Sequence, residues 1–451
     1  METEFLPNNT HLHSPNNFAD LDPHLQRMKE QKYIFHSSII DELPKEIPGI
    51  YNLGGGRQIG KTTLLKQWML ILLQKGKHPN AIAFLSCELI VDETSLYRIL
   101  INQLNDMEKE GIRYLILDEI TYVKNWDRAI KYLADTGAFE KVVVVISGSD
   151  LVMMQDARKR FPGRRGKAEK VDFHFYPLSF RESIQLTKQF PGEFDSKVPP
   201  QSETTQMLFE EFNNYCIHGG FLVAINEFAT TGTICNRTLA TYSDWIRGDV
   251  IKNGKKEHYL REIVGAIIKH YSSQISWRQL VNALSVEHTQ TAIEYISLLE
   301  SMDAVFIQSA LIEDKLVAAP KKHRKFMFCD PFIYHAMRAW LTPTSNPFED
   351  QINKAMKDPI LCSLIVESVV ATHFRRHYPT YYIKADSEVD IAYIDKNKFW
   401  PIEIKWTNQL RPNELKQILK YKNGKIWAKV NNESKIGATP ILPLPWALLT
   451  V

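Results

Sequence analysis

Runs of consecutive apolar residues alternate with stretches of helical spacing in the first part of the chain. The apolar runs lie at 50–53, 81–86, 114–117 and 142–147, and the clearest helical stretch covers 61–75. Strands without polar interruption are buried on both faces, which is typical of a parallel sheet covered by helices. The pattern therefore predicts an α/β core.

A different pattern follows the proline-rich stretch 191–203, which predicts a surface loop or hinge. Helical spacing dominates from 205 to 266. Between 275 and 308 a helix, a short break, a second helix and a strand-like run succeed one another, an order typical of a winged helix-turn-helix. Residues 325–430 combine a helix, a hairpin and further strands, which predicts a separate α/β unit.

Length and charge set wide bounds on the function. A chain of 451 residues is expected to form roughly two to four domains. The formal net charge of +3 is close to neutral for this length. A nucleic-acid surface would therefore have to come from local clusters of basic residues.

Cysteine usage and hydropathy indicate the compartment. The five cysteines are scattered and never form a CxxC pair, which argues against a disulfide framework or a zinc site. Residues 1–17 are polar and lack the apolar core of a signal peptide, and no apolar run is long enough to span a bilayer. We expect a cytoplasmic protein with no membrane partner.

A glycine-rich loop joins the first predicted strand to the first clear helix. It fits GxxxxGK[ST] at every fixed position, between a strand and a helix as that motif requires. Backbone N–H groups of such a loop cradle phosphates, the lysine neutralises their charge, and the hydroxyl binds Mg²⁺. The predicted ATP-binding residues are Gly55, Gly56, Arg57, Gln58, Ile59, Gly60, Lys61, Thr62 and Thr63.

Two carboxylates end the apolar run at 114–117. A buried strand that delivers Asp118 and Glu119 to its C-terminal end supplies a Mg²⁺ ligand, Asp118, and a base that orients water, Glu119. A capped strand without chemistry is the alternative. The position of this strand about 60 residues after a phosphate loop favours catalysis.

The run at 142–147 leads into Ser147-Gly148-Ser149-Asp150. A polar residue at this position senses the γ-phosphate in P-loop ATPases that have an extra strand between the two motifs. Ser149 is the candidate and Ser147 the second choice, with a plain turn as the alternative.

A basic stretch follows at 158–170. Arg164 or Arg165, after the turn at 162–163, is a candidate for an arginine that reaches the γ-phosphate of a neighbouring subunit, which would require a ring. A solvated basic loop is the alternative.

The C-terminal part contains a predicted hairpin whose turn is centred between Lys396 and Asn397. This register places Asp390 opposite Glu403, and period two puts Lys405 on the same face. Two carboxylates beside a lysine suit binding of Mg²⁺ and activation of water against a phosphodiester.

Flanking residues extend this candidate site. Glu367, in a predicted helix at 361–374, would add a third carboxylate, and Gln417 and Tyr421 would share one face of a helix at 413–421. The order Glu, Asp, Glu-x-Lys and Gln-x-x-x-Tyr resembles the PD-(D/E)XK nucleases of the RecB-like type. A chance surface hairpin, or a real fold without catalysis, is the alternative.

The predicted winged helix offers few groups for reading bases. Its second helix, at 288–299, presents Thr289, Gln290 and Glu294, and the basic run at 320–325 could contact phosphates. A winged helix used only for protein packing is the alternative.

Together these residues resemble the prokaryotic predicted AAA+ ATPases that carry a C-terminal restriction-endonuclease-like, PD-(D/E)XK domain. The segments that carry the resemblance are 56–63, 117–120, 161–166, 176–182, 219–221, 366–367 and 401–405. The resemblance implies a P-loop AAA+ core with a parallel sheet, a helical lid, a winged helix and a nuclease-like α/β domain. Asp390, Glu403 and Lys405 are all present, so decay of the nuclease motif, common in that family, is not evident here.

The expected division of the chain is an N-terminal arm (1–45), the ATPase core (46–185), the lid (186–255), the winged helix (256–318) and the nuclease-like domain (319–451). We expect catalytic roles for Lys61, Asp118, Glu119, Ser149, Arg164, Arg165, Asp390, Glu403 and Lys405. Expected metal ligands are Thr62, Asp118, Glu367, Asp390 and Glu403.

The first functional hypothesis is an ATP-hydrolysing ring, a homo-hexamer, that acts as a motor on duplex or branched DNA such as recombination and repair intermediates. The second is an ATP-gated signalling or defence switch whose C-terminal domain is a Mg²⁺-dependent DNA endonuclease. The third is a scaffold in which the nuclease-like fold only binds DNA.

Overall fold

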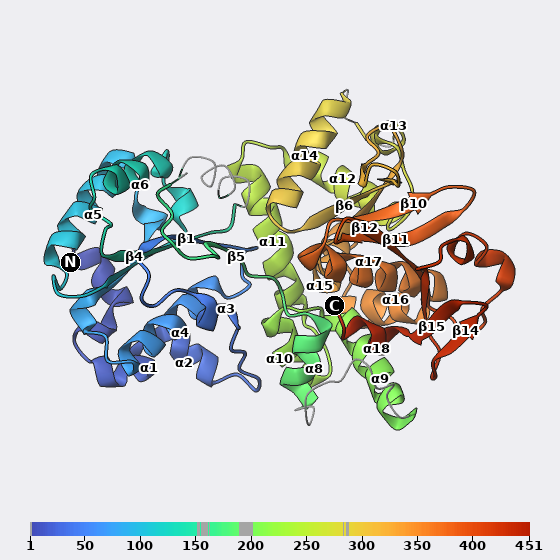
Figure 1. Ribbon diagram of the computed structural model, residues 1–451, viewed down its shortest axis with the longest axis horizontal. Coiled ribbons are helices and arrows are strands. Elements are labelled where there is room, and N and C mark those ends of the chain that lie inside the picture. Colours follow the sequence, from blue (N-terminus) through green and yellow to red (C-terminus); the bar gives the residue numbers. More distant parts are fainter. Residues whose placement is uncertain are drawn as a thin grey trace. The chain divides into compact units, whose positions relative to one another are not determined.

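The computed structural model describes residues 2–150, 154, 161, 163–188, 202–282, 284–285 and 288–451. The chain forms two compact units, Met1–Tyr176 and Pro177–Val451 (Figure 1). Within the described residues, no helix combines the length and the apolar character needed to cross a membrane. The finer division into five parts stays a prediction.

A parallel five-stranded sheet forms the centre of the first unit, as predicted, in the order β2-β3-β4-β1-β5. All four apolar runs are strands, and every residue of β1 and β4 is buried. The fifth strand was not predicted, because it is three residues long and only its central residue is buried. The strands are β1 (Gly49–Gly54), β2 (Ile82–Ser86), β3 (Arg113–Asp118), β4 (Val142–Gly148) and β5 (Asp172–His174).

Helices cover both faces of this sheet (Figure 1). One core cluster joins β-strand side chains to α5 (Glu93–Asp106) and α6 (Trp126–Asp135). The other joins them to α4 (Lys61–Gln74) and to the N-terminal helices. Those helices are α1 (Phe18–Leu21), α2 (Pro23–Lys29) and α3 (Ile39–Glu42), and short 3₁₀ turns lie at η1 (Thr3–Asn8), η2 (Thr10–Leu12), η3 (Pro15–Asn17), η4 (Pro79–Ala81), η5 (Cys87–Leu89) and η6 (Ile120–Tyr122).

The segment 1–45, expected to be an arm, packs within the first unit. The Asn9 side chain donates to Phe84 O at 2.7 Å and accepts from Phe84 N at 2.8 Å, so it pairs with the edge strand β2. His11 Nε2 lies 3.0 Å from Ile82 O. Lys66, fully buried on α4, lies 3.1 Å from Asp22, which caps α2. These polar contacts, with buried aromatic residues, tie the segment to the core.

Helices build the first half of the second unit. They are α8 (Phe180–Lys188), α9 (Ser202–His218), α10 (Leu222–Thr231), α11 (Asn236–Lys252), α12 (Glu257–Lys269) and α15 (Pro331–Leu341). The Gly219-Gly220 pair lets two segments meet, because a Cβ at Gly220 would lie 2.1 Å from Leu178 O. Asp330, the N-cap of α15, accepts a hydrogen bond from Gly220 N at 2.8 Å.

Between α12 and α15 lie α13 (Trp277–Val281), α14 (Thr289–Ser301) and a small antiparallel sheet of β6 (Val305–Ser309) and β9 (Arg324–Phe328). An isolated antiparallel bridge between Ile275 and Arg324 joins the segment before α13 to β9. A hairpin of β7 (Leu311–Ile312) and β8 (Val317–Ala318) connects β6 to β9. The small sheet therefore crosses the boundary expected at 318/319.

A mixed six-stranded sheet, in the order β10-β11-β12-β13-β15-β14, lies in the C-terminal part. Its strands are β10 (Thr380–Lys384), β11 (Glu388–Asp395), β12 (Lys398–Lys405), β13 (Lys425–Ala428), β14 (Ser434–Ile436) and β15 (Thr439–Pro443). The helical elements around it are η7 (Phe348–Asn353), α16 (Lys354–Lys357), α17 (Pro359–His377) and α18 (Leu444–Leu448). The helix expected at 413–421 is instead two 3₁₀ turns, η8 (Pro412–Glu414) and η9 (Ile418–Lys420), and Pro412 begins the first of them.

Acid is expected to weaken the attachment of the N-terminal segment through His11. Burial lowers the pKa of His11 to about 4, so the folded protein keeps the ring neutral while the unfolded chain binds a proton below about pH 6.5. The contribution of His11 to stability is therefore complete above pH 6.5 and lost as the pH falls toward 4, a loss of about 3 kcal/mol.

Urea unfolding of the wild type and His11→Gln from pH 7 to pH 4 measures this effect. The variant should lose less stability on acidification, because Gln does not titrate in this range, while its amide can still donate to Ile82 O at neutral pH. His13→Gln, at an exposed position, is the control and should follow the wild type. Equal pH dependence in wild type and His11→Gln would contradict the assignment.

Candidate functional sites

The loop from Gly55 to Gly60 connects β1 to α4. A Cβ at Gly55 would lie 2.4 Å from Phe175 O, so only glycine fits there. Gln58 and Gly60 adopt positive φ values of 58° and 102°, and Gly60 is the N-cap of α4. The loop thus ends at the positive end of a helix 14 residues long, where N–H groups and the helix dipole favour phosphate.

Thr62 and Asp118 meet although 56 residues separate them. The Thr62 hydroxyl donates to Asp118 Oδ2 at 2.7 Å, because β1 and β3 both run parallel to β4 and end at the same edge of the sheet. Burial raises the pKa of Asp118, while hydrogen bonds from Ser147 and Thr62 oppose that rise. A hydroxyl and a carboxylate fit the ligand preference of Mg²⁺.

Glu119 has a left-handed backbone, with φ 53° and ψ 42°, a conformation that costs energy for a side chain of this kind. Its carboxylate lies 3.5 Å from Lys61 Nζ. Lys61 also donates to Gly55 O at 3.0 Å and Gly56 O at 2.9 Å. The strained turn therefore directs the predicted base toward the phosphate loop.

Two serines at the end of β4 hold the two acids. Ser147 donates to Asp118 Oδ1 and accepts from Glu119 N at 3.1 Å. Ser149 donates to Glu119 Oε2 at 3.1 Å. The structure thus brings Ser149 into the site beside the predicted base, and its role as a sensor of the γ-phosphate stays a prediction.

Tyr122 was not identified from the sequence. Its hydroxyl accepts from Arg57 Nη2 at 2.5 Å, and the guanidinium also lies over its ring, 5.4 Å from the centroid. Arg57 Nε lies 3.5 Å from Ser149 Oγ. Arg57 therefore contacts Ser149, which holds Glu119. The sequence gives no signal for this contact, because Tyr122 stands there only as an aromatic residue in a loop.

The two candidate trans arginines form ion pairs within their own unit. Arg165 makes a bidentate pair with Asp172, and its side chain is 16% exposed. Arg164 pairs with Asp135, with 30% of its side chain exposed. Residues 158–160 and 162 of this basic stretch lie outside the described residues. A role in trans stays a prediction for both arginines.

The second candidate site lies on the hairpin of β11 and β12. Ile391 pairs with Ile402 and Asp395 with Lys398, the register that places Asp390 opposite Glu403. Lys396 and Asn397 have φ values of 48° and 58°, as a type I′ turn requires. Asp390 Oδ2 accepts from Ile404 N at 2.8 Å. The predicted register of the hairpin is confirmed.

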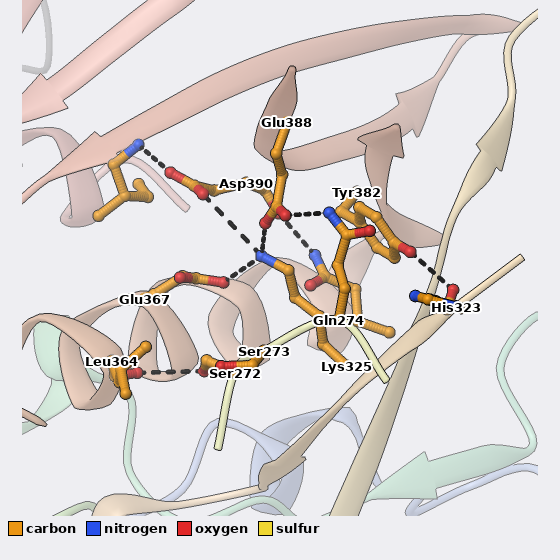
Figure 2. A network of polar contacts seen from close by, with 12 residues as sticks. Ser272, Ser273, Gln274, His323, Lys325, Leu364, Glu367, Tyr382, Glu388 and Asp390 are labelled. Atoms are coloured by element: carbon orange, nitrogen blue, oxygen red, sulfur yellow. Dashed lines mark hydrogen bonds and ion pairs between the residues drawn. The ribbon is translucent and has the colours of Figure 1, made fainter. Parts of the chain in front are cut away.

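Figure 2 shows three carboxylates converging on one ammonium group. Glu367 from α17 and Glu388 and Asp390 from β11 offer oxygens that all lie within 4.8 Å of one another. Lys325 Nζ lies 2.6 Å from Glu367 and 3.9 Å from Asp390, and it also pairs with Glu388. The Gln274 side chain donates to Glu388 as well.

Glu403 and Lys405 form an adjoining pair. Lys405 Nζ lies 2.6 Å from Glu403 Oε1, and Glu403 Oε2 is buried without a hydrogen-bond partner among the described residues. Burial and the charge of Asp390 raise the pKa of Glu403 to about 8. Burial likewise raises the pKa of Glu367 to about 8, although Lys325 opposes the shift.

Glu388 and Gln274 were not identified from the sequence as members of this site, and the predicted place of Lys325 was wrong. Lys325 was counted in a basic run that could contact phosphates, but only 1% of it is exposed. Strand β9 turns it inward, where three apolar residues, Phe326–Phe328, continue the strand. That apolar continuation is the signal that could have marked Lys325 as buried.

The spacing of Gln417 and Tyr421 predicted that their side chains lie close together. Gln417 Nε2 donates to the Tyr421 hydroxyl at 3.2 Å. They make this contact without the expected helix. The Tyr421 hydroxyl also donates to Glu313 Oε1 at 3.2 Å.

Two family matches cover different parts of the chain. Residues 48–184 match a family described as an AAA domain, AAA_14. The first functional site lies within the residues that match this family. Residues 209–344 match a domain of unknown function, DUF8612. The match to an AAA domain is evidence for ATP binding and ATPase activity.

Two relatives of this chain are described as uncharacterized proteins. A protein of Haemophilus influenzae is 23% identical over 268 residues, which cover 57% of this chain and 61% of that protein. MJ1544 of Methanocaldococcus jannaschii is 25% identical over 282 residues, or 60% of this chain and 57% of that protein. The chain thus matches about three fifths of the length of these relatives.

Two solved structures match this chain with low TM-scores and low sequence identity. The Walker-type ATPase PABY2304 of Pyrococcus abyssi has a TM-score of 0.40 and 14% identity, over 64% of this chain and 91% of that one. The Aeropyrum pernix ORC1 protein in complex with DNA has a TM-score of 0.33 and 14% identity, over 76% of this chain and 97% of that one.

Loss of the Ser149 hydroxyl is expected to slow ATP hydrolysis without preventing ATP binding. Ser149→Ala removes the donor that holds Glu119, and loss of such an orienting partner slows catalysis by about 10- to 100-fold. ATP affinity should change little, because the loop and Lys61 remain. Ser149→Thr keeps a hydroxyl and should retain most of the activity. Phosphate release and binding of a fluorescent ATP analogue measure the two effects; an unchanged rate in Ser149→Ala would contradict the role.

Proposed function

We propose that this protein is an ATP-hydrolysing AAA+ motor that acts on DNA as a homo-oligomeric ring, and that its C-terminal part carries a Mg²⁺-dependent nuclease-like site. Its substrates would be duplex or branched DNA such as recombination and repair intermediates, including four-way junctions. The observation that carries the proposal is the presence, on one chain, of an ATP site and of the carboxylate–lysine site on β11 and β12.

The ATP site supplies the groups that hydrolysis needs. Lys61 neutralises phosphate charge, Thr62 and Asp118 would hold Mg²⁺, and Glu119 orients the attacking water. Bound Mg²⁺ would stabilise charge on the β- and γ-phosphates. Ser149 keeps Glu119 in place, and Arg57, in contact with Ser149, ties this arrangement to the phosphate loop.

The second site suits phosphodiester chemistry. Glu367, Asp390 and Glu403 would hold the metal, which makes bound water a stronger nucleophile. Lys405, beside Glu403, would stabilise negative charge on the phosphate. Hydrolysis would add water across one P–O bond, leaving a phosphate monoester end and a free hydroxyl end.

The elements between α12 and β9 support contact with DNA. Three helices followed by a small sheet have the order of a winged helix. Thr289 and Gln290 are exposed at the start of α14, while Glu294 pairs with Lys255 at 2.5 Å. Few groups are thus free to read bases, which favours recognition of the shape and backbone of DNA over its sequence.

One observation favours the alternative function, an ATP-gated signalling or defence switch with a Mg²⁺-dependent DNA endonuclease as effector. Lys325 is bound among the carboxylates that would hold the metal. A site closed by an internal cation suits an enzyme that cuts only after a trigger. In this version the rate of ATP hydrolysis would not respond to DNA.

Purified protein with Mg²⁺ and ATP on linear, forked and four-way DNA tests the proposal. We expect DNA to stimulate ATP hydrolysis severalfold, strand exchange to be lost in Lys61→Ala, and any cleavage to be lost in Asp390→Ala. An ATPase rate that neither duplex nor branched DNA changes would exclude the motor and leave the switch. Intact DNA processing in Asp390→Ala would mean that the hairpin site does not cut.

A mixing experiment tests the ring and its trans arginine. Arg164→Ala and Glu119→Gln are each expected to lack activity, since one lacks the arginine and the other the base. If Arg164 acts across subunits, a mixture restores part of the ATPase rate, because some interfaces combine an intact Glu119 with an intact Arg164. Arg165→Ala is the matched comparison. No recovery with either arginine variant would mean that neither acts in trans.

A further inference from the structure

Two side chains enter the candidate metal site from outside the hairpin and α17. Lys325 comes from β9, and Gln274 precedes Ile275, which bridges to Arg324 next to Lys325. Lys325 thus belongs to the small sheet of β6 and β9, and Gln274 lies next to a residue that bridges to it; in Figure 2 both approach Glu388 from the same side of the site. Movement of this small sheet would displace both side chains together.

The ammonium of Lys325 occupies the position where a cation would be bound. It contacts one oxygen of Glu367 at 2.6 Å, pairs with Glu388, and lies 3.9 Å from Asp390. These are the same three carboxylates whose oxygens all lie within 4.8 Å of one another. An ammonium group and a divalent metal ion would therefore compete for these carboxylates.

Lysine alone does not balance the charge of the region. Four carboxylates, those of Glu367, Glu388, Asp390 and Glu403, face two ammonium groups, those of Lys325 and Lys405. If all were ionised and Lys325 were withdrawn, four negative charges would face the one positive charge of Lys405, an excess that would attract a divalent cation.

A second observation also indicates a missing ligand partner. Glu403 is 4% exposed, and its Oε2 has no hydrogen-bond partner among the described residues. A buried carboxylate oxygen of this kind is costly unless something binds it. Glu403 lies across the hairpin from Asp390, so a cation held by Asp390 would also be near Glu403.

We propose that Lys325 is an internal cation that competes with a divalent metal ion for Glu367, Glu388 and Asp390, so that metal binds only when β9 withdraws this side chain. The inference rests on the proposed metal site of the nuclease-like part, with which it shares Glu367 and Asp390, and it adds Glu388 as a ligand. It adds that the small sheet controls whether that site can be loaded. Gln274 holds Glu388 in the closed arrangement and leaves with Lys325.

Binding of Mn²⁺ without nucleotide tests the competition. Lys325→Met removes the ammonium and keeps the bulk of the side chain, so we expect Mn²⁺ to bind about tenfold more tightly or better, given the strength of close charge pairs. Electron paramagnetic resonance of free Mn²⁺ measures the affinity. The ions assigned to this site are those that the wild type binds and Asp390→Ala does not. Lys322→Met, at an exposed position on the same segment, is the matched control and should bind as the wild type does.

Stability gives an independent measure. Lys325→Met leaves buried carboxylates without their counter-charge, so its melting temperature should fall, and Mn²⁺ should restore it while changing the wild type less. If this variant does not fold, Lys325→Gln, which keeps hydrogen-bond donors near the carboxylates but removes the charge, should also bind Mn²⁺ more tightly than the wild type.

Unchanged or weaker Mn²⁺ binding in the folded variant would overturn the proposal. The Mn²⁺-binding result does not depend on whether the proposed nuclease site cuts DNA. DNA processing that survives Asp390→Ala would exclude cutting by this site and leave the measured competition between Lys325 and Mn²⁺ intact.

Discussion

A charged group can be buried at low energetic cost only if an opposite charge or a set of hydrogen bonds compensates it. This constraint determines the arrangement of charged groups in both units. In the first unit, buried Lys66 binds Asp22, and Lys61 is held by loop carbonyls and Glu119. In the second, Lys325 is surrounded by carboxylates. Each arrangement joins segments far apart in sequence. The polar groups of the candidate sites therefore also fix the path of the chain.

The sequence was sufficient for features that local rules determine. Apolar runs identified four strands of the first sheet, and parallel strands end at one edge, so Thr62 and Asp118 had to be near each other. The hairpin followed from a two-residue turn whose register leaves no freedom: once Lys396 and Asn397 form the turn, Asp390 must lie opposite Glu403.

Features that depend on tertiary packing could not be predicted. Lys325 stands in a basic run, and only the pairing of β9 with β6 turns it toward Glu367. No sequence pattern around Tyr122 predicts its contact with Arg57. The expected helix at 413–421 breaks into two turns, because Pro412 starts a short turn and the chain must return to β13, parallel to β12. The roles of Arg164 and Arg165 depend on a second subunit, which one chain does not specify.

The pairing of Asn9 with Phe84 has a consequence for self-association. β2 is an outer strand of its sheet, and outer strands with free N–H and C=O groups can recruit further strands from other molecules. The Asn9 amide satisfies both backbone groups of Phe84, and His11 contacts the carbonyl of Ile82. At this edge the protein thus carries its own blocking segment against aggregation. An assembly of several copies is therefore not expected to form by extending this sheet past β2.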